Sequence, residues 1–236
     1  MSLKMRLCLF QGVTHEDVFA AYEQFYRELD KTLVTSEFEI GNDHQIDIYQ
    51  QAHDWVVVGL DGGWERGIRQ AAYLSVSRSL DCAGFFIYVY VGWGYELFSD
   101  GVVRDQFISM GDPDGPAYCD DTANGCNGDL DKIIQLFPFL NVKDITPYLV
   151  RLMYPNMNPS LSVAERAKFD LDYKKIVDVP PRSGDEFMRF DQCGVLNFLR
   201  VLGVEVEMRA YQDKNGYTEN YVTFLAPVYK SFSVSD

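Results

Sequence analysis

Histidine is scarce in this sequence and cysteine is scattered, which removes the usual metal and disulfide frameworks. The 236 residues include three histidines and five cysteines. No Cys-x-x-Cys pair occurs, and no histidine lies near Cys119 and Cys126, so the spacing typical of a zinc site is missing. An odd number of cysteines in a chain of this length also argues against a disulfide framework. We therefore expect neither a zinc site nor a disulfide framework to stabilise the fold.

Long apolar runs are also lacking. No stretch approaches the ~18 apolar residues that typically cross a bilayer as a helix. No charged segment followed by an apolar one opens the chain, as it would in a secretory leader. The sequence therefore predicts a soluble, cytoplasmic protein without membrane association.

Positive charge is in short supply. Lys and Arg number 21 against 35 Asp and Glu, which leaves a net charge of −14. A field of this sign repels nucleic-acid phosphates and anionic membranes, so both are excluded as general partners. A basic protein surface or a metal cation remains a suitable partner, and the alternative is that the charge serves solubility alone.

Apolar residues are plentiful enough for a sizeable core. They make up 47% of the chain and aromatic residues 14%, and a chain of this size buries about 70% of its extended surface on folding. The first half alternates strand-like and helix-like patterns. Strand patterns cover 5–9, 55–60, 85–91, 95–99 and 102–108, helix patterns cover 15–29 and 65–80, and Asp100-Gly101 marks a hairpin turn. This order predicts an α+β fold with helices packed on a mainly antiparallel sheet.

The second half begins with an acidic loop that is rich in glycine and proline, at residues 111–128. Helical patterns follow, and the half is closed by a β-hairpin within residues 204–225. We therefore expect an α+β sandwich unit at 1–110, the loop at 111–128, and a helical unit with a C-terminal hairpin at 129–236. The sequence leaves open whether that hairpin joins the first sheet, so that the two units share one core.

The acidic loop is the first candidate for a binding site. From Asp120 onward it partly matches a calcium-binding EF-hand loop, but Asn127 stands where an apolar residue is required and Asp131 where a glutamate is required. A looser cation site is the remaining hypothesis. It would use the loop's carboxylates, namely Asp112, Asp114, Asp120, Asp121 and Asp129. The alternative is a solvated loop whose side chains cap the next helix.

A strand, two glycines and a helix form the second candidate. Backbone N–H groups at such a junction bind anions, and arginines strengthen the site. The residues concerned are Gly62, Gly63, Arg66 and Arg69. Because no complete phosphate-binding motif is present, the alternative is a plain tight turn. A third possibility is a metal or His–Asp site at His44 and His53, which have acidic neighbours, although no serine-nucleophile motif accompanies them.

Aromatic side chains near the predicted sheet form a candidate interface. Tyr88 and Tyr90 lie on the same side of their strand, and Trp93 follows them. Tyrosine and tryptophan are typical anchors of protein–protein interfaces. The alternative is that all three pack in the core.

The segment from Tyr95 to Phe107, YELFSDGVVRDQF, resembles a strand–turn–strand segment found in uncharacterised bacterial proteins. It covers 13 of the 236 residues. The resemblance implies a strand hairpin and no assigned activity.

These features favour a non-catalytic protein that binds a protein partner. Its specific versions are an immunity protein, which binds a basic toxin, and a regulatory protein. The reasons are the acidic charge and the lack of any complete catalytic motif. No cofactor is expected, and the sequence leaves the oligomeric state open. The alternative is a metal-dependent hydrolase that uses the acidic residues within 112–131 or the region of His44 and His53.

Overall fold

The protein is described by a computed structural model. The described residues are 3–36, 45–50, 54–60, 66–89, 92–111, 126–153, 162–164, 180–188, 192–212, 218–225 and 228–235. The chain divides into two compact units. Unit 1 contains residues 1–88, 95–104 and 203–236, and unit 2 contains residues 89–94 and 105–202. Most of the predicted boundary loop at 111–128 lies outside the described residues, so a division at that loop stays a prediction.

The sheet has the strand order β2-β12-β3-β4-β1-β5-β6-β7. Its strands are β1 (Leu3–Gln11), β2 (Thr32–Thr35), β3 (Gln45–Gln50), β4 (Trp55–Leu60), β5 (Ala83–Val89), β6 (Trp93–Ser99), β7 (Val102–Ile108) and β12 (Val228–Ser235). The pairs from β2 through β12, β3 and β4 to β1 are antiparallel. The C-terminal hairpin is also present, formed by β10 (Val206–Gln212) and β11 (Thr218–Phe224), and β11 pairs in parallel with the start of β1. The predicted fold class is therefore confirmed.

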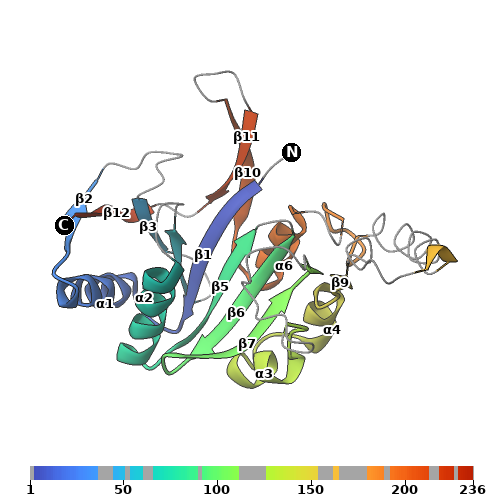
Figure 1. Ribbon diagram of the computed structural model, residues 1–236, viewed down its shortest axis with the longest axis horizontal. Helices are drawn as coiled ribbons and strands as arrows, with labels where there is room; N and C mark the ends of the chain where they lie inside the picture. Colours follow the sequence, from blue (N-terminus) through green and yellow to red (C-terminus); the bar gives the residue numbers. More distant parts are fainter. Residues whose placement is uncertain are drawn as a thin grey trace. The chain divides into compact units, whose positions relative to one another are not determined.

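Two helices of unit 1, α1 (His15–Glu28) and α2 (Arg66–Ser79), pack side by side (Figure 1). Helix α1 begins as predicted, because the side chain of Thr14 accepts a hydrogen bond from the Asp17 backbone N–H. The inward rings of both helices pack on strand residues. Tyr22 of α1 lies edge-on to Phe10 of β1, and Tyr73 of α2 stacks on Phe86 of β5. Aromatic packing thus holds the helices to the sheet.

Unit 2 has its own core of large rings. Trp93 contacts Phe107 and Phe198, and Tyr148 contacts Phe198. All four rings are buried. The unit's elements are α3 (Leu130–Leu136), α4 (Val142–Ile145), a 3-10 turn (Thr146–Tyr148), α6 (Gly194–Val201) and the short parallel pair of β8 (Met110–Gly111) and β9 (Leu152–Met153).

The predicted Asp100-Gly101 hairpin turn is present between β6 and β7. Both residues have positive φ angles, of 52° and 73°, as a tight hairpin turn requires. The turn lies against the last part of α2, where a Cβ at position 101 would come 3.0 Å from the Leu74 carbonyl oxygen and 2.9 Å from the Arg78 Cβ. Glycine is therefore required at position 101 both by the backbone angle and by the close approach of the helix.

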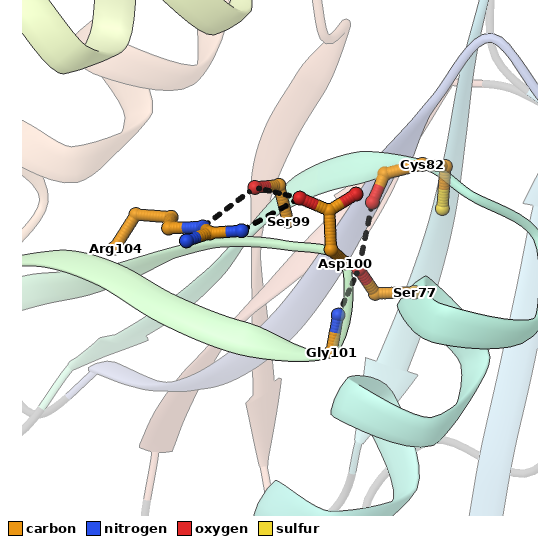
Figure 2. Close-up of polar contacts among 6 residues, drawn as sticks. All are labelled: Ser77, Cys82, Ser99, Asp100, Gly101 and Arg104. Carbon is orange, nitrogen blue, oxygen red and sulfur yellow. Dashed lines mark hydrogen bonds and ion pairs between the residues drawn. The ribbon is translucent and has the colours of Figure 1, made fainter.

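One hydroxyl ties this turn to the end of α2 (Figure 2). The buried Ser77 Oγ donates a hydrogen bond to the Cys82 carbonyl oxygen at 2.6 Å and accepts one from the Gly101 N–H at 3.3 Å. On the outer side of the turn, Arg104 donates to the Ser99 hydroxyl and to the Asp100 carboxylate. Ser77 thus connects α2, the start of β5 and the hairpin through a single side chain.

Replacing Ser77 with alanine should destabilise the protein. The substitution leaves the Gly101 N–H and the Cys82 carbonyl without their hydroxyl partner, at an expected cost of about 1–3 kcal/mol in the free energy of unfolding. Urea denaturation measures this cost. The matched control is Ser79→Ala, in the same helix, because Ser79 is exposed and only bonds back to its own helix. Equal losses for the two variants would contradict the proposed role of Ser77.

Candidate functional site

A buried polar cluster lies where α1 and α2 cover the sheet in unit 1. Its members come from four elements, β1, α1, α2 and β6, and are Cys8, Tyr22, Tyr26, Arg69, Gln70, Tyr73 and Glu96. Local periodicity explains how each helix contributes. Residues 22 and 26 are four apart on α1, and residues 69 and 73 are four apart on α2, so each pair projects from one helix face.

The Glu96 carboxylate is the acceptor at the centre of this cluster. It is only 2% exposed. The Gln70 side-chain amide donates a hydrogen bond to it at 2.9 Å, and the Tyr73 hydroxyl donates a second one. Buried Arg69 and Glu96 both act electrostatically on the Cys8 thiol. A charged carboxylate at such a depth requires these donors, because an uncompensated buried charge is strongly unfavourable.

Burial keeps the thiol and the three phenols of the cluster neutral. It is the main cause that raises the pKa values of Cys8, Tyr22, Tyr26 and Tyr73 above their ordinary values. For Tyr73, the neighbouring Glu96 carboxylate raises the pKa further. A thiol must ionise to act as a nucleophile, so Cys8 is unreactive in this environment. The same holds outside the cluster for Cys82, whose pKa burial raises to about 12.

A smaller polar group is buried on β3 and β12. The Asp47 carboxylate, 7% exposed, accepts hydrogen bonds from the Ser231 hydroxyl at 2.6 Å and from the Gln45 side-chain amide at 2.9 Å. Burial raises the pKa of Asp47 above its ordinary value of 3.8, and the two hydrogen bonds partly oppose that rise. A carboxyl with a raised pKa beside a serine resembles part of a catalytic site, but neither the Asp47 nor the Ser231 side chain is open to a substrate.

The predicted anion-binding residues are described only in part. Gly62 and Gly63 lie outside the described residues, and Arg66 is the first residue of α2. Arg69 is 6% exposed and belongs to the buried polar cluster. Anion binding at this junction stays a prediction.

Of the five aspartates predicted to bind a cation, only Asp129 lies among the described residues. It is the N-cap of α3, where its carboxylate accepts hydrogen bonds from the Asp131 and Lys132 N–H groups. The Asp105 carboxylate accepts the Asp129 N–H at 2.7 Å. A surface hollow of about 480 Å³ adjoins these residues. In the part of the chain that the structure describes, no group of three or more His, Cys, Asp or Glu side chains is arranged to hold a metal ion.

The predicted aromatic interface maps to the interior where it is described. Tyr88 is 2% exposed and packs beside Phe86, and Trp93 is 1% exposed within unit 2. Tyr90 lies outside the described residues, as do His44 and His53. An interface at these rings stays a prediction, and the contacts seen for Tyr88 and Trp93 are those of core residues.

Comparison with models of known families, with curated proteins and with solved structures finds no match. The site therefore has to be interpreted from its own chemistry.

Two further observations bear on what the sequence predicted about membrane helices and cysteines. Among the described helices, none is long and apolar enough to cross a membrane. Cys126 is disulfide-bonded, although no disulfide was expected from the sequence, whereas Cys8, Cys82 and Cys193 are buried and form no disulfide.

Sequence reasoning missed the buried acids Glu96 and Asp47 as well as Asp105. One signal could have identified Glu96, since it is the single charged residue in the strand Trp93–Ser99, all of which is buried. No comparable signal existed for Asp47. Its partner Ser231 is 184 positions away in the sequence, and the pairing of β3 with β12 alone brings the two together.

The two tyrosines Tyr73 and Tyr22 should respond differently to loss of the hydroxyl. Tyr73→Phe removes a donor from the buried Glu96 carboxylate, so we expect a loss of about 1–3 kcal/mol in the free energy of unfolding. Tyr22 is the matched control, because its hydroxyl interacts with the neutral Cys8 thiol, a weak hydrogen-bond partner, and not with a carboxylate. Tyr22→Phe should therefore cost less stability than Tyr73→Phe. Urea denaturation of both variants tests this, and a larger loss for Tyr22→Phe would refute the assignment.

Asp47 should make the stability fall as the pH rises. Because the pKa of Asp47 is raised in the folded state, the folded state binds the proton more tightly than the unfolded state does. The free energy of unfolding therefore falls as the pH rises from 3.8, the ordinary pKa, to the folded-state pKa. We expect Asp47→Asn to be the more stable protein at neutral pH, since the neutral amide oxygen can accept both hydrogen bonds without burying a charge.

Urea denaturation of Asp47→Asn and the wild type across the acidic to neutral range measures this effect. The advantage of Asp47→Asn should shrink towards low pH. The control is Asp54→Asn, at an exposed position in the turn between β3 and β4. A difference between Asp47→Asn and the wild type that does not change with pH would show that desolvation of the carboxylate is not the cause.

Proposed function

We propose that this chain is a non-catalytic binding protein whose partner is a protein with a basic surface. The observation that carries the proposal is the excess of carboxylates on the outer side of α1 and at its C-terminal end. Five acids lie between residues 15 and 31, against two cations, Arg27 and Lys31. These acids are Glu16, Asp17, Glu23, Glu28 and Asp30.

Helix stability explains only part of this charge. Glu16 and Asp17 lie in the first turn of α1, where the helix dipole favours acids. Glu23 pairs with Arg27 at 3.2 Å. Glu28 ends the helix and Asp30 follows it, where the same dipole disfavours negative charge. Both are exposed. Glu28 also accepts a hydrogen bond from the Gln24 side-chain amide at 3.1 Å. Exposed acids at the end of the helix where the dipole disfavours them nevertheless support a role in binding.

The buried polar cluster supports the non-catalytic part of the proposal. Its carboxylate, guanidinium and thiol are each at most 6% exposed, and burial raises the pKa of Cys8 so that the thiol stays protonated. Catalysis requires a side chain that a substrate can reach in the correct protonation state. The cluster is better suited to holding α1 and α2 on the sheet. We also propose, from the sequence, that the protein works in the cytoplasm; immunity proteins and regulators are the classes that this description fits.

A metal-dependent hydrolase is the second candidate. The hollow beside Asp105, Asp129 and Asp131 favours it, because carboxylates facing a hollow are suited to a hard cation. It ranks second because Asp105 and Asp129 already accept backbone hydrogen bonds, and Lys132 lies 3.5 Å from the Asp129 carboxylate.

The proposed function can be tested with a displayed library of random peptides about as long as a strand, roughly eight residues, selected on the full chain. We expect the selected peptides to be rich in Lys and Arg, and their affinity to fall at high salt because screening weakens the attraction. The double variant Glu28→Gln, Asp30→Asn should weaken binding by about tenfold, the effect of ~1.4 kcal/mol. Asn is chosen at position 30 because it tolerates the positive φ of 58° found there.

The matched control removes the same amount of charge elsewhere in unit 1. Asp81→Asn, Asp100→Asn changes two exposed turn residues that also have positive φ angles. This variant should bind the selected peptides as the wild type does. Selection of peptides without basic residues, or equal effects of the two double variants, would refute the proposal.

A further inference from the structure

Strand β2 is the last strand at one end of the sheet. It comprises Thr32–Thr35 and pairs with β12 on one side. Among the described residues, no strand pairs with its other side. An edge strand presents backbone N–H and C=O groups that another chain can pair with.

The register identifies which backbone groups face outward. Thr35 lies opposite Phe232 and Leu33 opposite Val234, and the N–H of Ser36 donates to the Ser231 carbonyl oxygen. In an antiparallel pair, hydrogen-bonded positions alternate with positions whose N–H and C=O point away from the partner strand. Because position 36 is a bonded one, position 34 is bonded as well. The N–H and C=O groups of Leu33 and Thr35 therefore point to the open edge.

Within the part of the chain that the structure describes, this edge lacks the usual protections. Thr32, Leu33, Val34 and Thr35 include no charged residue and no proline, and three of the four are exposed, with Val34 47% exposed. Natural sheets normally protect such edges with charges, proline or a covering segment.

The other end of the sheet, β7, is protected in two ways. Arg104 and Asp105 place charges on this strand, and its second half is covered by residues 126–128. That cover includes a bridge from Phe107 to Asn127 and a hydrogen bond from the Ile108 N–H to the Cys126 carbonyl. Strand β10 is also paired on one side only among the described strands, but it carries the charged residues Glu207 and Arg209. These differences single out β2 as the edge suited to pairing.

Charge decides which chain would pair there. Helix α1 packs against β2. In the sequence, Glu28 and Asp30 lie just before the strand, with Lys31 between Asp30 and Thr32, and residues 15–31 as a whole carry five acids against two cations. A segment added to β2 would therefore lie close to a helix with an excess of negative charge. A second copy of this chain carries −14 itself and would place the same acids nearby, so like charges would oppose its pairing.

We propose that the basic partner donates an extended segment that adds to the sheet along β2, with hydrogen bonds to the backbone of Leu33 and Thr35. This inference rests on the proposed function and specifies how the partner binds. Backbone pairing supplies affinity without sequence preference, and the carboxylates of α1 select basic side chains.

Amide hydrogen exchange, measured by NMR on the full chain with a selected basic peptide, tests the geometry directly. The amides of Leu33 and Thr35 should exchange freely without peptide and become protected when the peptide binds. The amide of Val34, which faces β12, should be protected in both states. Binding without protection of Leu33 and Thr35 would overturn strand addition.

The variant Thr35→Pro provides an independent test. Proline removes an outward N–H that no described strand uses, so the free protein should fold, as edge strands accept proline at such positions. Affinity for the peptide should fall by about tenfold or more, since one hydrogen bond and the close approach of the added strand are lost. Thr35→Val keeps the N–H and is the matched control, which should bind as the wild type does. If Thr35→Pro does not fold, the amide exchange of Leu33 and Thr35 in the wild type still decides whether the peptide adds to β2.

The outcomes separate the two proposals. Basic peptides that bind without affecting Leu33 and Thr35, or equally well to Thr35→Pro, leave the proposed function intact and overturn strand addition. If no basic peptides are selected, the proposed function fails and this inference fails with it. Sedimentation of the free protein adds a further check, because a dimer with protected Leu33 and Thr35 amides would show that a second copy occupies the edge.

Discussion

Burial of the Glu96 carboxylate is the constraint on which the helical layer of unit 1 depends. A charge placed in a strand whose residues are all buried must receive donors from the layer above it. Gln70 and Tyr73 supply those donors from one face of α2, so the helix has little freedom to rotate or slide. Arg69 of the same helix acts electrostatically on the Cys8 thiol. The hydrogen bonds to Glu96 therefore set the position of α2. The aromatic rings around the buried polar cluster supply much of the buried area.

This arrangement separates the charges of unit 1 into two populations with different roles. Acids in the interior, Glu96 and Asp47, are occupied by donors and contribute to specifying the packing. The acids on the outer side of α1 are solvated, and they continue past the first turn, which is the part of the helix where the dipole favours acids. A helix that packs inward through Tyr22 and Tyr26 leaves its opposite side available to a partner. The neighbouring strand β2 carries no charged residue, and no described strand pairs with the backbone groups on its outer side.

Much of the fold was predictable where the signal is local. The helix after Thr14 and the Asp100-Gly101 hairpin each depend on a few neighbouring residues. Strands β2, β3 and β12 were missed. The strand β3 buries Gln45 and Asp47, so polar residues stand at inward positions and obscure the alternation. The strand β2 has only four residues and joins the sheet through a segment near the C-terminus. Tyr88, a candidate interface residue, is buried, and the pattern of its strand alone did not show that its side is covered.

The sequence by itself determined the α+β class, the acidic charge, the start of α1 and the glycine turn at Gly101, because each follows from composition or from contacts between near neighbours. Only the tertiary structure decided which acids are buried, that Arg69 is buried, and that β2 is paired on one side only among the described strands. These properties depend on pairs such as Asp47 and Ser231, which are distant in the sequence. Burial of a charge is a property of the folded surroundings, and residue type alone does not reveal it.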